Sequence, residues 1–276
     1  MSHLGKDKTG HRIPLPAGGA IVLSWAARSD VGHRRQNNED SVVVASPMFA
    51  VADGMGGHAS GDRASAAAVE HLQPRKGIKF LDIETLEASL AAASADIDTL
   101  AEGIPVGVGT TVTGAALILI NDAPVFAVFN IGDSRVYRME NNDLVQVTTD
   151  HSVVQELVAA GRLSPEEAEN HPYGNVITRA VGPTDSVKPD YVRLDLVDGD
   201  RFVICSDGLT KELTDYGIQH FLGEHADPGD AVTAMMDAAL ENGGRDNVTL
   251  IVLNVSRQGG AGDLDDDTAD SSPAAD

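Results

Sequence analysis

Five short acidic segments of this sequence, called stations below, have the residue types and the placement of a divalent-metal site. Each stands at the border of a short apolar run, where the end of a strand would hold a side chain in a cleft. The stations are Glu39-Asp40, Asp53-Gly54, Asp133-Ser134, Asp207-Gly208 and Asp246-Asn247. Carboxylate oxygens without His or Cys partners favour Mg²⁺ or Mn²⁺ over zinc.

Turn chemistry is the alternative explanation for each station taken alone, because Asp caps turns and Gly adopts positive φ angles. Five neighbouring carboxylates would, however, repel one another unless cations bound between them. We therefore favour a metal centre, which requires the elements that carry the stations to converge on one cleft.

The overall charge and the cysteine content exclude several classes of partner and site. The 276 residues include 42 acidic and 20 basic side chains, and the net charge of −22 at pH 7 repels nucleic acid and anionic membranes. Cys205 is the only cysteine, so an intramolecular disulfide and a multi-thiolate zinc site are both excluded. Ala20 to Trp25 is too short for a signal peptide, and no apolar run reaches membrane-spanning length. These features predict a cytoplasmic protein.

Composition divides the chain into three parts. Residues 1–18 are polar and rich in Pro and Gly, and we expect a flexible N-terminal segment. Residues 257–276 contain six Asp and almost no apolar bulk, which predicts a disordered acidic tail. Residues 19–256 show no internal repeat and no long linker, and we expect them to fold as a single domain.

Within that domain, runs with strand patterns alternate with segments at helical spacing. The expected strands are Ala20–Ala26, Ser41–Ala45, Met48–Ala52, Thr111–Ile120, Val125–Ile131, Arg135–Met139, Leu144–Val147, Tyr191–Leu196, Arg201–Cys205 and Val248–Val255. The expected helices are Ser60–Gln73, Glu84–Ala101, His151–Ala160, Ser164–Asn170, Thr214–Phe221 and Asp227–Glu241. Short polar turns between successive strands favour antiparallel hairpins. This order predicts an α+β fold in which two sheets pack face to face with helices outside.

Eight short motifs, in order across residues 28–249, resemble those of the PPM-type, metal-dependent serine/threonine protein phosphatases, also called type 2C. The motifs are Arg28 to Gly32 with Arg35 to Asp40, Asp53 to His58, Gly109 to Thr111, Gly132 to Arg135, Thr149 to Ser152, Thr178 to Gly182, Ser206 to Leu209 and Asp246 to Thr249. The second motif matches the bacterial form. The resemblance implies a four-layer αββα sandwich of two antiparallel sheets flanked by helix pairs, with a small flap subdomain at about residues 151–185.

The resemblance also implies which residues bind two ions of Mn²⁺ or Mg²⁺. Asp53 would bridge the two ions and the carbonyl of Gly54 would bind one of them. Asp207 and Asp246 would complete the other ion's site. Glu39 or Asp40 would reach this centre directly or through water.

Three further residues have candidate roles in the same site. Asp133, together with Asp207, matches the positions that hold a third metal ion in bacterial members. Ser152 could lend that ion an oxygen, or it could be the N-cap of the following helix. Arg35 matches the phosphate-binding arginine of the family, the alternative being a solvated surface residue.

At Met55 the sequence departs from the family, at the position of the residue that acts as general acid in animal members. Animal members carry a histidine at the position of Met55, and that histidine protonates the leaving group, which Met cannot do. His58 is a candidate substitute, although it equally fits a histidine at the start of a helix.

The function implied is hydrolysis of phosphoserine and phosphothreonine in proteins by a metal-activated water, with Arg35, Asp53 and Asp207 as catalytic residues. The implied partners are phosphorylated proteins and the bacterial Ser/Thr kinases whose action is reversed, and we expect a monomer without nucleic-acid or membrane partners. Small phosphoesters or one dedicated regulator of transcription are alternative substrates that the sequence does not separate from this one.

Two other functions fit parts of the sequence. Met48 to Ala59 also fits a strand followed by a dinucleotide-binding glycine motif, and Ile78 to Asp82 could be the second strand of an NAD-binding enzyme. The many hairpins and the negative charge of Asp53 argue against that hypothesis. A catalytically silent fold acting as a regulatory binding module would be indicated by missing metal-site carboxylates, and none is missing.

Overall fold

The computed structural model of the chain describes residues 1–56, 60–103, 107–169, 171–182 and 188–259. The strands are β1 (His3–Gly5), β2 (Lys8–Pro14), β3 (Ala20–Asp30), β4 (Asp40–Ala45), β5 (Met48–Met55), β6 (Gly109–Thr110), β7 (Val112–Ile120), β8 (Ala123–Ile131), β9 (Arg135–Glu140), β10 (Asp143–Gln146), β11 (Asp190–Asp195), β12 (Arg201–Cys205) and β13 (Val248–Gln258). The helices are α1 (Gly61–Leu72), α2 (Ile83–Ala101), α3 (Val153–Ala159), α4 (Pro165–Glu169), α5 (Asp207–Thr210), α6 (Asp215–Glu224) and α7 (Pro228–Glu241).

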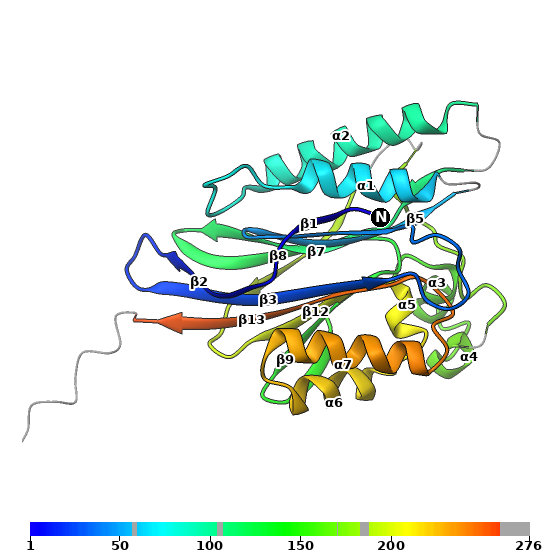
Figure 1. Cartoon of the computed structure of the whole chain (residues 1–276). Coiled ribbons are helices and arrows are strands. Elements are labelled where there is room, and N and C mark those ends of the chain that lie inside the picture. Colours follow the sequence, from blue (N-terminus) through cyan, green and yellow to red (C-terminus); the bar gives the residue numbers. More distant parts are fainter. Residues whose placement is uncertain (57–59, 104–106, 170, 183–187, 260–276) are drawn as a thin grey trace, which may run out of the picture.

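Two sheets form the centre of the fold (Figure 1). The first has the order β1-β4-β5-β7-β8-β11, with β6 paired to β5, and the second has the order β10-β9-β12-β13-β3-β2. Both sheets are antiparallel except for the pairing of β1 with β4, which is parallel. The hairpin turns Asn121-Asp122 and Asn141-Asn142 have positive φ at both residues, the geometry that matches the twist of a two-residue hairpin.

Helices cover the outer faces of both sheets, which gives the expected four layers (Figure 1). Leu86 and Ile97 of α2 are buried in one apolar cluster with the outer face of the first sheet. Met235 of α7 belongs to a second cluster on the outer face of the other sheet. A third cluster fills the space between the sheets, where Phe126 and Phe202 meet edge to face with ring centroids 5.3 Å apart. The predicted αββα sandwich is confirmed.

The N-terminal residues differ from the expectation of a flexible segment, because they form β1 and β2. β2 pairs with β3, and Ile13 is buried in the cluster between the sheets. The Trp25 indole nitrogen donates to the carbonyl of Lys6 at 2.9 Å, and the amide of Ala27 donates to the Asp7 carboxylate at 3.0 Å. A polar edge strand held by backbone pairing and one buried side chain has too weak an apolar pattern to predict from sequence.

The C-terminal boundary of the domain also differs from the predicted one. β13 continues to Gln258, which pairs with Ala20, so the strand includes the first two residues of the expected tail. The remainder of the predicted acidic tail, from residue 260 onward, lies outside the described residues.

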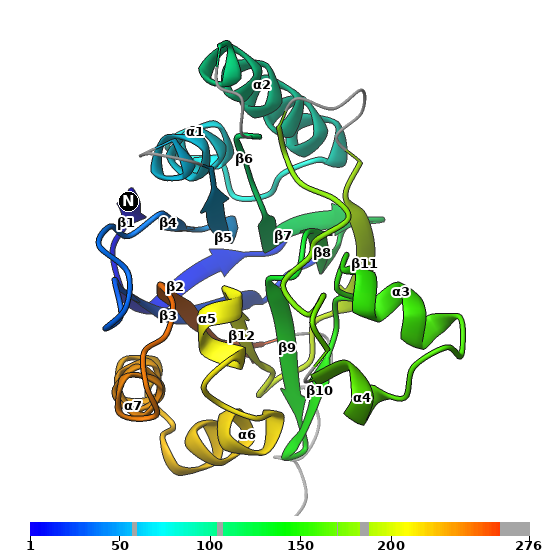
Figure 2. The ribbon, with the colours of Figure 1, turned by 90° about the vertical axis from the view of Figure 1, so that its right-hand side faces the viewer.

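The predicted flap contains α3 and α4, which lie beside the edge formed by β10 and β11 (Figure 2). The segment closes on itself through backbone hydrogen bonds from Val153 to Val176 at 2.9 Å and from Thr178 to His151 at 2.8 Å. Residues 170 and 183–187 of the predicted flap lie outside the described residues.

Candidate metal centre

The predicted strand-end aspartates converge at the end of the sandwich that faces the viewer in Figure 2, where α5 lies. Asp40 and Asp53 are directly opposite each other in the β4–β5 ladder. Asp207 follows β12, Asp246 precedes the neighbouring strand β13, and Asp133 lies between β8 and β9. Burial, and then the negative charges of the other four aspartates, raise the pKa of Asp53 well above its usual value. The structure therefore brings the five stations into one electrostatic cluster.

Burial makes ionisation of Asp40 and Asp133 unfavourable. The Asp40 side chain is fully buried, and burial together with the charges of Asp207 and Asp246 raises its pKa to about 7. Burial and the charges of Asp207 and Asp150 likewise raise the pKa of Asp133 to about 7. Carboxyl groups buried beside one another take up protons or cations, because like charges cannot all ionise at close range.

Several of the buried oxygens are suited to a divalent cation. Oδ1 of Asp40, of Asp207 and of Asp62 in α1 has no hydrogen-bond partner among the residues that the structure describes. The other oxygen of Asp40 accepts a hydrogen bond from the Ser206 hydroxyl at 2.8 Å. Unpartnered buried carboxylate oxygens are costly unless a cation or proton joins them, and oxygen is the ligand type that a hard ion such as Mn²⁺ or Mg²⁺ prefers.

Two cationic side chains contact the cluster. Lys211 Nζ lies 2.6 Å from Asp207 Oδ2 and 2.9 Å from Asp246 Oδ2, and Arg35 Nη2 lies 2.8 Å from Asp246. Burial lowers the pKa of Lys211, but the charges of Asp207 and Asp246 and the hydrogen bonds to them together outweigh burial and raise that pKa. Burial raises and Lys211 lowers the pKa of Asp246, with a net decrease. Within the described ranges, no three His, Cys, Asp or Glu side chains are disposed to hold one ion.

The loop that precedes β4 is anchored to the loop that precedes β13. Asn247 donates through Nδ2 to the carbonyls of Val31 and Asn37 at 2.9 and 3.0 Å, and its Oδ1 accepts from the Glu39 amide at 2.8 Å. The Glu39 side chain lies at the edge of the cluster, where burial and the charge of Asp62 raise its pKa.

Gly54 allows the start of α1 to approach β5 closely. A Cβ atom on Gly54 would lie 2.0 Å from the Gly61 carbonyl oxygen and 2.6 Å from that of Glu39. The Gly54 amide donates to the Glu39 carbonyl at 3.2 Å. Glycine is therefore required here by the contact with backbone, whatever its carbonyl binds.

The two remaining candidate site residues are Ser152 and His58. Ser152 is buried and its hydroxyl accepts the amide of Gln155 at 3.3 Å, so it forms the N-cap of α3 that the sequence offered as its alternative role. His58 lies outside the described residues.

His151, beside that N-cap, links the flap to the turn that carries Asp133. Its Nδ1 accepts the amide of Gly132 at 3.1 Å, and Nε2 lies 3.0 Å from Asp190 of β11. Arg179 pairs with the other oxygen of Asp190 at 2.7 Å.

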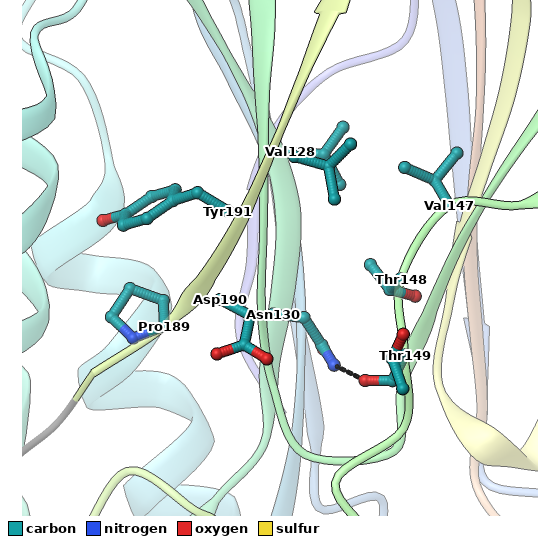
Figure 3. A pocket seen from close by; sticks show the side chains of 9 residues that line it. Val128, Asn130, Val147, Thr148, Thr149, Pro189, Asp190 and Tyr191 are labelled. Carbon is teal, nitrogen blue, oxygen red and sulfur yellow. Dashed lines mark hydrogen bonds between the residues drawn. The ribbon is translucent and has the colours of Figure 1, made fainter. Parts of the chain in front are cut away.

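A cavity of about 440 Å³ opens next to this link (Figure 3). It is lined by side chains of β8, of β11 and of the segment after β10, among them Val128, Asn130, Thr149 and Tyr191. Asn130 donates to the Thr149 carbonyl at 3.0 Å across it. The lining includes none of the five aspartates, so this cavity is separate from the acidic cluster.

The structure corrects the dinucleotide-binding hypothesis. Leu81 makes only an isolated bridge to Ile118, and Ile78 to Asp82 forms no strand of a parallel sheet. Asp82 instead accepts the amide of Thr85 at 2.6 Å as the N-cap of α2. The strand β5 belongs to an antiparallel arrangement with β4 and β7, in which no βαβ unit occurs at this position.

Two residues of the site escaped sequence analysis. Lys211 follows Asp207 by four residues, a spacing that places both side chains on one face of a helical turn and would have been a signal. Asp62 stands in the first turn of α1, where an acidic residue has an ordinary explanation in the helix dipole.

Comparisons with known proteins give one family. Residues 30–242 match the profile of the family described as Protein phosphatase 2C. The serine/threonine protein phosphatase PstP of Mycobacterium tuberculosis is 38% identical over 240 residues, which cover 85% of this chain and 45% of PstP. The protein phosphatase PhpP of Streptococcus pneumoniae is 34% identical over 245 residues, covering 83% of this chain and 96% of PhpP. The chain thus spans less than half the length of the first relative and nearly all of the second.

A solved structure agrees with the sequence matches. The catalytic domain of PstP in complex with two manganese ions superposes with a TM-score of 0.74 at 35% identity, over 86% of this chain and 99% of that domain.

Proposed function

Because this chain belongs to the protein phosphatase 2C family, we propose that it hydrolyses phosphoserine and phosphothreonine in proteins with Mn²⁺ or Mg²⁺ as cofactor. The observation that carries the proposal is the cluster of five aspartates, with buried unpartnered oxygens on Asp40 and Asp207. The relatives PstP and PhpP are protein phosphatases by name, and the manganese ions of the PstP domain support the same cofactor.

In this proposal Asp53, Asp207 and Asp246 hold the core ions, with the backbone of Gly54 and either Asp40 or Glu39 completing their surroundings. Asp133, with Asp207, would hold a third ion. Bound divalent cations would lower the pKa of a water molecule and offset the charge of the phosphate. The role of Ser152 in that third site is weakened as a proposal by its use as a helix cap.

Arg35 is the proposed phosphate-binding residue. Its side chain is half exposed, and its guanidinium already reaches the cluster through Asp246 at 2.8 Å. A planar guanidinium can pair with two phosphate oxygens, which a lysine ammonium cannot match in geometry. Its position argues against a purely solvated surface role.

The proposed partners are phosphorylated proteins and the Ser/Thr kinases that modify them. None of the helices in the described part of the chain has the length and apolar character needed to cross a bilayer. The monomeric state and the cytoplasmic location stay predictions from the sequence.

Phosphate release from a phosphothreonine peptide tests the proposal. Purified protein is assayed with EDTA, Mg²⁺ or Mn²⁺, beside Asp207→Asn as a control for contaminating phosphatases. We expect metal-dependent release that the variant lacks. Inactivity of folded, manganese-binding protein toward several phosphopeptides would instead favour a regulatory binding module.

A further inference from the structure

Lys211 is held at the cluster by its position in the chain. It is the C-cap residue of α5, and its amide donates to the Asp207 carbonyl at 2.8 Å. Its side chain is 30% exposed and turns back toward Asp207, the first residue of the same helix. The ammonium therefore reaches two carboxylates, one on Asp207 of α5 and one on Asp246 in the loop before β13.

Both oxygens of the Asp246 carboxylate are in contact with donors. Oδ1 lies 2.8 Å from the Asn247 amide and 2.8 Å from Arg35 Nη2. Oδ2 lies 2.8 Å from the same Arg35 nitrogen and 2.9 Å from Lys211 Nζ. Three donor groups, the Asn247 amide, Arg35 Nη2 and Lys211 Nζ, make these four contacts, and Arg35 Nη2 is shared between the two oxygens. A metal ion that binds Asp246 therefore competes with these donors.

Asp207 presents a contrasting arrangement. Its Oδ1 is buried without a partner, whereas its Oδ2 is 2.6 Å from Lys211. Lys211 is therefore the one cation in the described residues that pairs with both proposed ligands, and a metal ion that bridges them would compete with its ammonium for Asp207 Oδ2 and Asp246 Oδ2.

We propose that Lys211 is a tethered cation that competes with divalent metal ions for Asp207 and Asp246, and so sets the metal affinity of the site. This rests on the proposed function, because it takes both residues as metal ligands. Lys211 balances their charge in the metal-free protein and weakens metal binding by the free energy needed to release its two ion pairs. The site would then fill only at correspondingly higher metal concentrations.

Isothermal titration of chelator-treated, full-length protein with MnCl₂ tests this competition. Lys211→Met keeps the aliphatic stem and removes the ammonium, so we expect Mn²⁺ to bind about tenfold more tightly. Lys211→Arg keeps a competing charge and should stay near the wild-type affinity. Arg245→Met is the matched control, because Arg245 precedes Asp246 but pairs with Glu212 at 3.0 Å, and its loss should change the affinity less than about twofold.

Thermal unfolding provides a second measurement that does not depend on activity. Tighter binding predicts a larger Mn²⁺-induced rise in melting temperature for Lys211→Met than for wild type. Circular dichroism checks folding, and Lys211→Gln replaces the Met variant if that variant does not fold.

The outcomes separate this inference from the proposed function. Wild-type binding of Mn²⁺ with equal or weaker binding by Lys211→Met would overturn the competition and leave the proposed metal site in place. Equal tightening in Lys211→Met and Arg245→Met would also overturn it, since general electrostatics would then suffice. Absence of Mn²⁺ binding by wild type would overturn the proposed metal site and the inference with it.

Discussion

Replacing Asp40 with Asn should stabilise the metal-free protein at neutral and alkaline pH. Asp40 is fully buried, faces Asp53 across the ladder, and pairs with no cation among the described residues. Its pKa rises from 3.8 to about 7, which corresponds to about 4 kcal/mol at 1.36 kcal/mol per pKa unit. Because the folded state holds this proton more tightly than the unfolded state does, the contribution is favourable at low pH and is lost as the pH rises toward 7.

The expected net gain is smaller than the electrostatic term. Asn can keep the hydrogen bond from Ser206 through its carbonyl oxygen, but burying its amide costs about 1–3 kcal/mol. A net gain of about 2 kcal/mol at pH 8 would raise the melting temperature by about 4–8 °C. At pH 5 only the interval from 3.8 to 5 contributes, about 2 kcal/mol, and the two terms nearly cancel.

Thermal unfolding with a chelator at pH 8 and pH 5 measures this difference. Asp98→Asn, at an exposed position on α2, removes one negative charge far from any station and should shift the melting temperature little at either pH. With saturating Mn²⁺ at pH 8, wild type should gain more stability than the Asp40 variant. A variant that is less stable than wild type by the same amount at both pH values would refute the buried-charge reasoning.

Three other substitutions test the same site. Asp53→Asn should abolish phosphate release while thermal unfolding stays cooperative, because it removes charge rather than core volume; near-native turnover would exclude Asp53 as a ligand. Arg35→Ala, assayed at saturating Mn²⁺, should raise KM for a phosphopeptide by about tenfold or more with a smaller change in kcat, and an unchanged KM would return Arg35 to the surface. Asp246→Asn should destabilise the metal-free protein at pH 7 by about 1–2 kcal/mol, because Lys211 and Arg35 lower the pKa of Asp246 and stabilise its charge. That loss should shrink as the pH falls through the lowered pKa, and equal loss at pH 7 and pH 3.5 would contradict the assignment.

The sequence was informative where local chemistry and site chemistry demand the same residues. Asp followed by Gly or Ser at a strand end satisfies turn geometry and also points a carboxylate into a cleft, so Asp53 and Asp207 were predictable from their neighbours. The helix α5, which begins at Asp207, was missed because four residues carry no periodic pattern. β2 was missed because Ile13 is its one fully buried apolar side chain.

The contacts that Arg35 and Lys211 make with Asp246 could not be predicted from the sequence, because they join segments far apart in the chain. Arg35 and Asp246 are separated by 211 positions and meet only when the loop before β4 packs against the loop before β13 through Asn247. The motif resemblance gave Arg35 a role toward phosphate, whereas the structure gives it a carboxylate partner as well.

The arrangement of charges implies a conflict between stability and function that falls unevenly on the five aspartates. Asp40 and Asp133 carry charge that the folded chain disfavours, as their raised pKa values indicate, whereas Asp246 carries charge that Lys211 and Arg35 favour. Three apolar clusters supply the stability that allows Asp40 and Asp133 to stay buried at strand ends. Substitutions that relieve Asp40 should therefore strengthen the metal-free fold while weakening metal binding. Removal of the Lys211 ammonium should instead weaken the metal-free fold and strengthen metal binding, because this cation offsets the negative charge of the metal-free cluster.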